Sequence, residues 1–350
     1  MIRIGIVGCG FIGQVHSYCL GRLAAAGAVD AQVTATYDVD ADRAAKLALR
    51  HRAEVSADLD SLTESVDVVW VCTWTAAHAE AVAAAVAGQR AVYCEKPLAP
   101  SLAAATSVAA DLGRVPHQVG LVLRHAPVFT AAAAAIASGR YGPPLAAVFR
   151  DDQYFPIQGR YASGWRAETD LAGGGTLLEH SIHDLDVLRW LLGDPTEVTA
   201  RVETRFGHPG IDDTATVTLG FPDGAVATLV SVWHRILSRE STRRLEVFCE
   251  EGLLWTDDDC LGPLHVETAA GEEIIAAGLP GWMAESGIPA EFAAGLAQYA
   301  EPARAFLLAL ERDGAAARGH PDADLALAAH RLVDHAYRAA ATGLPVAIPR

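Results

Sequence analysis

The stretch that decides the fold is residues 2–16, "IRIGIVGCGFIGQVH". An apolar run of strand length comes first, three glycines follow in G-x-G-x-x-G spacing, and a mixed apolar and polar stretch suited to a helix comes next. Gly8 permits a tight turn, Gly10 lets backbone N–H groups approach a pyrophosphate, and Gly13 lets the helix pack closely on the strand. The stretch therefore predicts the opening of a dinucleotide-binding unit. Its phosphate loop is expected to consist of Gly8, Gly10, Phe11, Ile12 and Gly13.

An acidic residue follows the second predicted strand. The segment "AQVTATYD" (31–38) is rich in β-branched residues and ends in Asp38, thirty residues after Gly8. In a dinucleotide-binding unit, an acid at this place accepts hydrogen bonds from the adenosine ribose, and its charge repels the 2′-phosphate of NADP. We therefore expect Asp38 to select NAD.

Strand-like and helix-like segments continue to alternate up to residue 123, which predicts a doubly wound parallel sheet. Ligands of such sheets bind beyond the carboxyl ends of the strands. Two segments fall there, "TWTAAH" (73–78) and "EKP" (95–97). The residues expected at this cofactor rim are Thr73, Trp74, His78, Glu95 and Lys96. His78 has an equally good alternative role as a packing residue at the start of its helix.

Residues 124–350 have a different pattern, in which strand-like runs are joined by short turns such as "FPDG". This pattern predicts an α+β domain with a large, mostly antiparallel sheet. Between its first two strands lies "AGGGTLLEHSIHDLDVLRWLLGDP" (172–195), a glycine-rich segment that leads into a helix. On that helix Glu179, His183 and Asp186 would share one face, either as a solvated surface or as a proton-handling site in which Glu179 orients His183.

The composition argues against several classes of partner. The formal net charge is −16 and no basic run stands out, so nucleic acid is not an expected partner. The apolar stretches are Ala-rich and too short to predict a membrane span. The opening "MIRIGIVGCG" has neither a basic leader region nor a cleavage site, so a cytoplasmic location is expected.

The sequence does not predict a metal site. The six cysteines contain no C-x-x-C pair. Four possible ligands crowd together on the second-domain helix, but they lack H-E-x-x-H spacing and would occupy opposite helix faces. These residues are His180, His183, Asp184 and Asp186.

The combination of these motifs resembles the glucose-fructose oxidoreductase, inositol dehydrogenase and MocA (Gfo/Idh/MocA) family. The glycine loop, Asp38, the segment 78–99 and the segment 173–186 carry the resemblance, which extends to the closing "AHRLVDHAYRAAATGLPV". In that family the lysine of E-K-P contacts substrate and nicotinamide, and the histidine of the second motif is the base. The resemblance assigns these roles to Lys96 and His183.

Two positions depart from the family pattern. The acid four residues before the histidine is commonly Asp and is Glu179 here, one methylene longer. The residue after Thr73 is often proline and is Trp74 here. These departures concern the reach of the acid and the shape of the wall beside the nicotinamide or the substrate.

The resemblance implies an NAD-dependent dehydrogenase acting on a CH–OH group of a sugar, inositol or related polyol. A Rossmann domain would span residues 1–123, and a substrate-binding and oligomerisation domain would span 124–350. The catalytic residues would be Lys96, His183 and Glu179. The residues expected to bind substrate are Lys96, Arg124, Tyr154, Trp165, Arg166, Glu179 and His183, with Tyr161, Trp233 and His234 as further lining candidates.

Two other functions stay open at the level of sequence. Some relatives keep NAD bound and cleave glycosides through transient oxidation, and a dinucleotide fold can also serve a non-catalytic regulator. The second domain contains no lysine, which favours an unphosphorylated substrate. An exposed sheet face there would favour a dimer or tetramer.

Overall fold

The structure is a computed structural model that describes residues 1–276 and 278–349. It divides the chain into two compact units, and each is described by itself. The first unit comprises residues 1–122 and 279–327, and the second comprises the other described residues.

The two units differ from the two predicted domains mainly in one large segment. The second unit begins at Leu123, one residue before the predicted boundary. Residues 279–327, which the sequence places in the second domain, belong to the first unit because helix α9 (Ala290–Asp313) buries an apolar face in its core. The residues that α9 adds to this core are Ala300, Ala303, Phe306 and Leu307.

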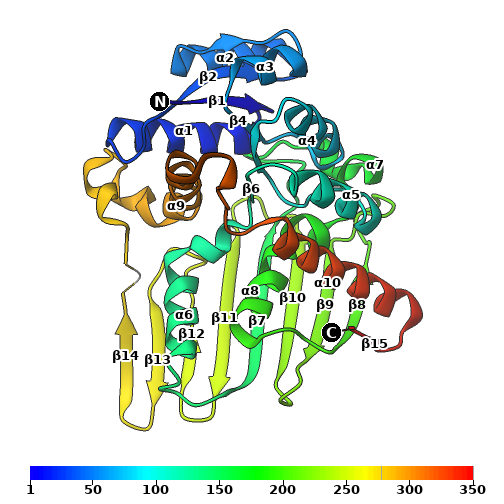
Figure 1. Cartoon of the computed structure of the whole chain (residues 1–350). Helices are drawn as coiled ribbons and strands as arrows, with labels where there is room; N and C mark the ends of the chain where they lie inside the picture. Colours follow the sequence, from blue (N-terminus) through cyan, green and yellow to red (C-terminus); the bar gives the residue numbers. More distant parts are fainter. Residues whose placement is uncertain (277, 350) are drawn as a thin grey trace. The chain divides into compact units, whose positions relative to one another are not determined.

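The first unit is built on a six-stranded sheet of order β3-β2-β1-β4-β5-β6, in which every pair is parallel (Figure 1). The chain runs outward from β1 to β3 and then crosses back to β4, so the predicted doubly wound sheet is confirmed. The strands are β1 (Ile2–Val7), β2 (Ala31–Tyr37), β3 (Glu54–Val55), β4 (Val68–Val71), β5 (Ala91–Cys94) and β6 (His117–Val119). The other helices are α1 (Phe11–Ala25), α2 (Ala41–His51), α3 (Leu59–Ser65), α4 (His78–Ala87) and α5 (Leu102–Leu112), and α10 (Ala323–Thr342) runs on into the second unit.

The second unit is built on a nine-stranded sheet of order β14-β13-β12-β11-β7-β10-β9-β8-β15. Only the central pair of β7 and β10 is parallel among the described strands, so the predicted mostly antiparallel sheet is confirmed. The strands are β7 (Pro144–Tyr154), β8 (Glu197–Glu203), β9 (Thr214–Gly220), β10 (Val226–His234), β11 (Thr242–Cys249), β12 (Leu253–Trp255), β13 (Leu264–Thr268), β14 (Gly271–Ile275) and β15 (Val346–Ala347). The helices are α6 (Pro127–Ala137), α7 (Thr169–Ala172) and α8 (Ile182–Leu192).

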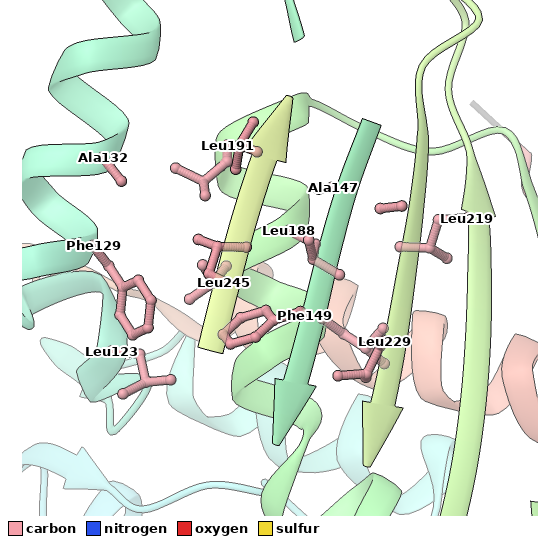
Figure 2. Close-up of a cluster of buried hydrophobic side chains, with 14 of the residues drawn as sticks. Leu123, Phe129, Ala132, Ala147, Phe149, Leu188, Leu191, Leu219, Leu229 and Leu245 are labelled. Carbon is pink, nitrogen blue, oxygen red and sulfur yellow. The ribbon is translucent and has the colours of Figure 1, made fainter. Parts of the chain in front are cut away.

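One face of this sheet forms the core of the second unit. Along β9 and β10 every second residue is buried, as expected for a strand with one covered face. Figure 2 shows Phe129 of α6 beside Phe149 of β7, and their ring centroids are 5.8 Å apart. Leu188 of α8 packs into the same cluster. The core therefore fixes α8, the helix that carries His183, against the middle of the sheet.

The glycine-rich segment before α8 is required by close packing. A Cβ on Gly174 would lie 2.5 Å from the hydroxyl oxygen of Tyr337, and a Cβ on Gly175 would lie 1.8 Å from the carbonyl oxygen of Asp212. Contacts this short force the backbone to move. Glycine is therefore the residue that lets this segment lie against α10 and the loop before β9.

Asp212 holds the same segment by hydrogen bonds. Its carboxylate accepts from the backbone N–H groups of Gly175 (2.7 Å) and Leu177 (2.9 Å) and from the hydroxyl of Tyr337 (2.7 Å). Burial raises the pKa of Asp212, and these three donors oppose that rise. The backbone that precedes Glu179 is consequently fixed.

The structure corrects the predicted single helix. Glu179 lies in a π-helical turn, Thr176–His180, whereas His183 and Asp186 lie in α8. The two segments meet at Ser181, whose hydroxyl donates to Ser231 of β10 (2.6 Å) and so ties the junction to the sheet. The hydrogen bond to the sheet therefore fixes the point at which the π-helical turn ends and α8 begins. Such π turns are frequent at functional sites.

Candidate functional site

The phosphate loop has the geometry that its glycines predict. Gly8 has φ +93°, and a Cβ there would lie 2.6 Å from the backbone of Cys72. A Cβ on Gly13 would lie 2.1 Å from the carbonyl oxygen of Gly8. A Cβ on Gly10 would meet nothing within 4 Å. The loop thus turns tightly, packs closely on α1 and leaves open space in front of Gly10, which fits a dinucleotide pyrophosphate.

Asp38 lies at the end of β2 and is tied to this loop. Its Oδ2 accepts from the backbone N–H of Cys9 (2.7 Å), and its Oδ1 accepts from the backbone N–H of Asp40 (2.8 Å). A carboxylate oxygen can accept more than one hydrogen bond, so both oxygens retain capacity for ribose hydroxyls. Burial, followed by the charge of Asp38, raises the pKa of the Cys9 thiol to about 12, so this cysteine stays neutral.

The structure places His78 between two segments of the predicted rim. Its side chain is buried, with Nδ1 2.9 Å from the carbonyl oxygen of Pro97 and Nε2 3.3 Å from that of Thr73. These contacts give His78 a packing role that orients both segments. Its contact with the cofactor stays a prediction.

A buried ion-pair geometry lies beside Lys96. Glu95 accepts a hydrogen bond from His16 of α1, with Nε2 and Oε1 2.7 Å apart, and both side chains are buried. Glu95 was predicted from the sequence, whereas His16 was not. The spacing of His16, three residues after Gly13 on the helix face that packs on the sheet, is the only feature that marked it.

In the second unit the structure pairs Glu179 with Arg166. Arg166 Nε donates to Glu179 Oε2 at 2.9 Å, and the Arg166 guanidinium lies over the ring of Trp165 at 4.3 Å. The carboxylate of Glu179 is buried, and the partly exposed guanidinium of Arg166 balances its charge. The predicted role of Glu179 in orienting His183 stays a prediction.

Arg124 and Asp186 form a second pair. Arg124 donates from Nε to Asp186 Oδ2 (2.7 Å) and from Nη2 to Oδ1 (2.9 Å), and its guanidinium lies over the ring of Trp190 at 5.4 Å. Both side chains are buried. The bidentate geometry commits Arg124 to α8. The predicted contact of Arg124 with substrate is therefore limited to the guanidinium atoms that this ion pair does not use.

The remaining lining candidates lie in different environments. Tyr154 and Tyr161 lie together, with ring centroids 5.5 Å apart. Trp233 is fully buried and stacks on Phe155 at 4.9 Å, so it serves the core of the second unit. Burial lowers the pKa of His234, whose Nε2 lies 3.6 Å from Asp152.

A buried network of charges, which the sequence did not predict, adjoins Glu179 and His183. Arg243 of β11 donates to Asp184 (2.9 Å), to His180 (2.8 Å) and to Asp259 (3.3 Å). His180 Nδ1 lies 2.9 Å from Asp151 of β7. Because Arg243 donates to His180 Nε2, the ring hydrogen is on Nδ1, the nitrogen nearer Asp151.

Burial and the neighbouring Asp151 carboxylate raise the pKa of Asp184 to about 7, while Arg243 opposes the rise. Burial also raises the pKa of Asp151. The network therefore holds more carboxyl groups than its single arginine can balance as full charges. The segment that carries Glu179 and His183 is anchored by it to β7 and β11.

A hollow of about 610 Å³ on the first unit is separate from the predicted site residues. Arg22, Arg50 and His51 come from the last turns of α1 and α2, where the negative end of a helix favours cations. Its lining is Gln14, Ser17, Tyr18, Gly21, Arg22, Ala24, Gln32, Arg50, His51 and Arg52. The position of these basic residues at the helix ends explains why they are there without a ligand.

Within the described residues the chain has neither a membrane-spanning helix nor a metal cluster. No helix there combines the length and hydropathy of a membrane span. No group of three or more His, Cys, Asp or Glu side chains in residues 1–276 and 278–349 has the arrangement of a metal site.

A doubly wound sheet with this glycine loop and acid defines a dinucleotide-binding protein, and the second unit adds a large sheet with a His-bearing helix. A profile described as the oxidoreductase family with an NAD-binding Rossmann fold matches residues 2–120, and the GFO/IDH/MocA C-terminal domain profile matches residues 129–255. The chain belongs to the Gfo/Idh/MocA family of oxidoreductases. It is an NAD-dependent oxidoreductase, as its motifs indicate.

Similar proteins cover most of the chain. Inositol 2-dehydrogenase 2 of Paenarthrobacter aurescens is 32% identical over 72% of this chain and 74% of its own. The 1,5-anhydro-D-fructose reductase of Ensifer adhaerens is 33% identical over 65% of this chain and 68% of its own. Levoglucosan dehydrogenase, solved in complex with NADH and L-sorbose, has the same fold with a TM-score of 0.86 at 21% identity, over 100% of this chain and 99% of its own.

Asp38→Ala should weaken NAD binding by about 10- to 100-fold, which corresponds to about 1.5 to 3 kcal/mol for the lost charged hydrogen bonds. Fluorescence titration with NAD and NADP measures this. Asp42→Ala, an exposed change on α2, is the matched control and should bind as the unmutated protein does. Tighter binding of NADP than of NAD by the unmutated protein would contradict the role of Asp38.

Asp184→Asn should flatten the dependence of stability on pH. With a folded-state pKa of about 7 against an ordinary value of 3.8, Asp184 keeps a proton in the folded state that the unfolded chain loses. Stability therefore falls as pH rises from about 4 to 7, with a slope of up to about 1.4 kcal/mol per pH unit from this group. Denaturant unfolding at several pH values measures the slope, with the exposed change Asp60→Asn as control. Equal slopes in the unmutated protein and Asp184→Asn would exclude a protonated Asp184.

Proposed function

We propose that this oxidoreductase transfers a hydride between a CH–OH carbon of a sugar, inositol or related polyol and NAD. The observation that carries the proposal is the pairing of an intact NAD loop with sequence relatives named for cyclic polyol and sugar chemistry, inositol 2-dehydrogenase and 1,5-anhydro-D-fructose reductase. Bound NAD supplies the hydride acceptor. The loop around Gly10 and the carboxylate of Asp38 would hold it.

Three side chains would carry out the proton transfer and stabilise the developing charge. His183 accepts the hydroxyl proton as the C–H bond breaks, and Lys96 as an ammonium donates a hydrogen bond to the oxygen on which negative charge develops. Glu179 orients His183 and is itself held by Arg166. The π-helical turn places Glu179 on a fixed backbone, which supports an orienting role.

The arginines of the second unit support an unphosphorylated substrate. Arg124 is committed to Asp186, and Arg166 to Glu179, by hydrogen bonds of 2.9 Å or less. Arg160 lies 3.6 Å from Glu240. A phosphate would have to compete with these carboxylates. Tyr154, Tyr161 and Trp165 offer ring faces for the apolar side of a sugar.

The proposal is tested by NADH formation across a panel of inositols, polyols, aldoses and their phosphates. We expect turnover with an unphosphorylated cyclic compound, and a loss of about 10² to 10⁴ in rate for His183→Ala. Lys96→Ala should also lose turnover, whereas Lys46→Ala, which changes an exposed residue and the only other lysine of the chain, should not. Full turnover by His183→Ala with an unchanged pH profile would show that another group is the base.

Two different outcomes would replace this function. Release of sugar from aryl glycosides, with no net NADH and with NAD that does not exchange, would identify a glycosidase. Tight NAD binding with no turnover on the panel would indicate a regulator. A sugar phosphate that exceeds its parent sugar more than tenfold in kcat/KM would overturn the substrate class.

We also propose a homo-oligomer, a dimer or tetramer, formed through the second face of the nine-stranded sheet. On this face Val148, Val226 and Phe248 are 40–48% exposed; Val148 lies opposite Thr228 and Glu246, and the other two lie opposite Ala146. Light scattering should give a multiple of 36.8 kDa, and Val148→Lys should lower it. A monomer at micromolar concentration would contradict the proposal. A cytoplasmic location stays a prediction from the sequence.

A further inference from the structure

The carboxylate of Glu95 is enclosed by three elements of the first unit. Its Oε1 lies 2.7 Å from Nε2 of His16 on α1, and its Oε2 accepts from the backbone N–H of Lys96 (3.2 Å). A Cβ on Gly120, after β6, would lie 2.6 Å from Oε1, so the absence of a side chain there makes room for the carboxylate. The residue directly before Lys96 is therefore held from several sides.

The ring of His16 is itself fixed by aromatic packing. Its centroid lies 5.1 Å from that of Tyr93, 5.6 Å from that of Tyr299 and 6.1 Å from that of Trp70. The His16 side chain is 0% exposed. Because a carboxylate can only accept, the ring hydrogen in this contact is on Nε2. The packing and the hydrogen bond together determine where the donor points.

Charge explains why this donor matters. Burial raises the pKa of Glu95, but the hydrogen bond and electrostatic attraction of His16, together with the charge of Lys96, bring it below its ordinary value. Glu95 is thus a buried carboxylate that stays ionised. The other titratable groups facing it are neutral, because burial and the charge of Glu95 raise their pKa values. These groups are Cys72, Tyr93 and Cys94.

We propose that His16 is a positioning residue for Lys96 and acts through the buried carboxylate of Glu95. His16 lies three residues after Gly13 on α1, the helix whose N-terminus faces the phosphate loop. The link therefore connects the cofactor-binding helix to the segment that carries the lysine. The inference rests on the proposed function only for the role of Lys96 at the reacting carbon.

Loss of the His16 donor has a defined consequence. The buried carboxylate would keep one hydrogen bond fewer, so it would take up a proton or turn away. Either change removes negative charge from beside Lys96 and loosens the backbone that Glu95 holds. A neighbouring opposite charge favours the ammonium form of lysine, so Lys96 should lose its proton more easily.

The sequence makes this consequence measurable, because the chain has only two lysines, Lys46 and Lys96. In a Lys46→Arg background, reductive methylation with ¹³C-formaldehyde labels Lys96 and the N-terminus, and NMR titration follows the lysine signal. His16→Phe, which keeps an aromatic ring but removes the donor, should lower the Lys96 pKa by about one unit. His16→Gln, which keeps an N–H donor, should restore most of it. Ser17→Ala on the same helix is the matched control and should leave it unchanged.

A double-mutant cycle tests the route through Glu95. Glu95→Gln should lower the Lys96 pKa as His16→Phe does, and the two changes together should produce no further shift. His16→Leu serves the same comparison if His16→Phe does not fold, and Glu95→Gln tests the link from the carboxylate side. An unchanged Lys96 pKa without the donor, or shifts that add in the double variant, would overturn the proposal.

These readouts use no substrate, so they separate this inference from the proposed function. With an active substrate, His16→Phe should also lower kcat by about 10- to 100-fold with little change in KM for NAD. If no polyol is oxidised but the lysine signal shifts as expected, the positioning role stands and the proposed function fails. If turnover is normal and the signal does not move, the positioning role fails and the function stands.

Discussion

The hydrogen bonds to the buried carboxylate of Asp212 are the interaction on which the second unit depends. They hold the backbone N–H groups of Gly175 and Leu177 and tie them to Tyr337 of α10. The carbonyl oxygen of Asp212 lies so close to Gly175 that no side chain fits. The chain leaves this contact along one path, through a π-helical turn into α8. Glu179 and His183 are placed by that path.

Both units stabilise the backbone beside a predicted catalytic residue with a buried carboxylate and a histidine. In the first unit Glu95 precedes Lys96 and pairs with His16. In the second unit Asp151 pairs with His180, which follows Glu179. A buried carboxylate without a donor is costly, so each pair fixes two elements relative to one another. These supports hold the backbone of the predicted catalytic residues in place.

The two histidine pairs differ in charge balance. Glu95 stays ionised, because the hydrogen bond and electrostatic attraction of His16, together with the charge of Lys96, outweigh its burial. Burial and the neighbouring Asp151 carboxylate raise the pKa of Asp184 to about 7, and Arg243, which also serves Asp259, only partly opposes the rise. The first pair therefore preserves a charge next to Lys96. In the second unit the raised pKa values of Asp151 and Asp184 reduce the buried negative charge, while Arg243 still donates to Asp184, which suits an anchoring role.

The sequence by itself determined the doubly wound sheet, the tight glycine turn after its first strand and the mostly antiparallel sheet. These depend on local rules, namely glycine spacing, strand and helix periodicity and turn residues. Tertiary structure alone decided that residues 279–327 pack into the first unit, that Glu179 leaves the α8 helix, and that Arg124 and Arg166 are committed to carboxylates. His16 and Arg243 were missed for the same reason. Their partners lie 79 and 59 residues away, and only the folded chain brings such donors and acceptors within hydrogen-bond distance.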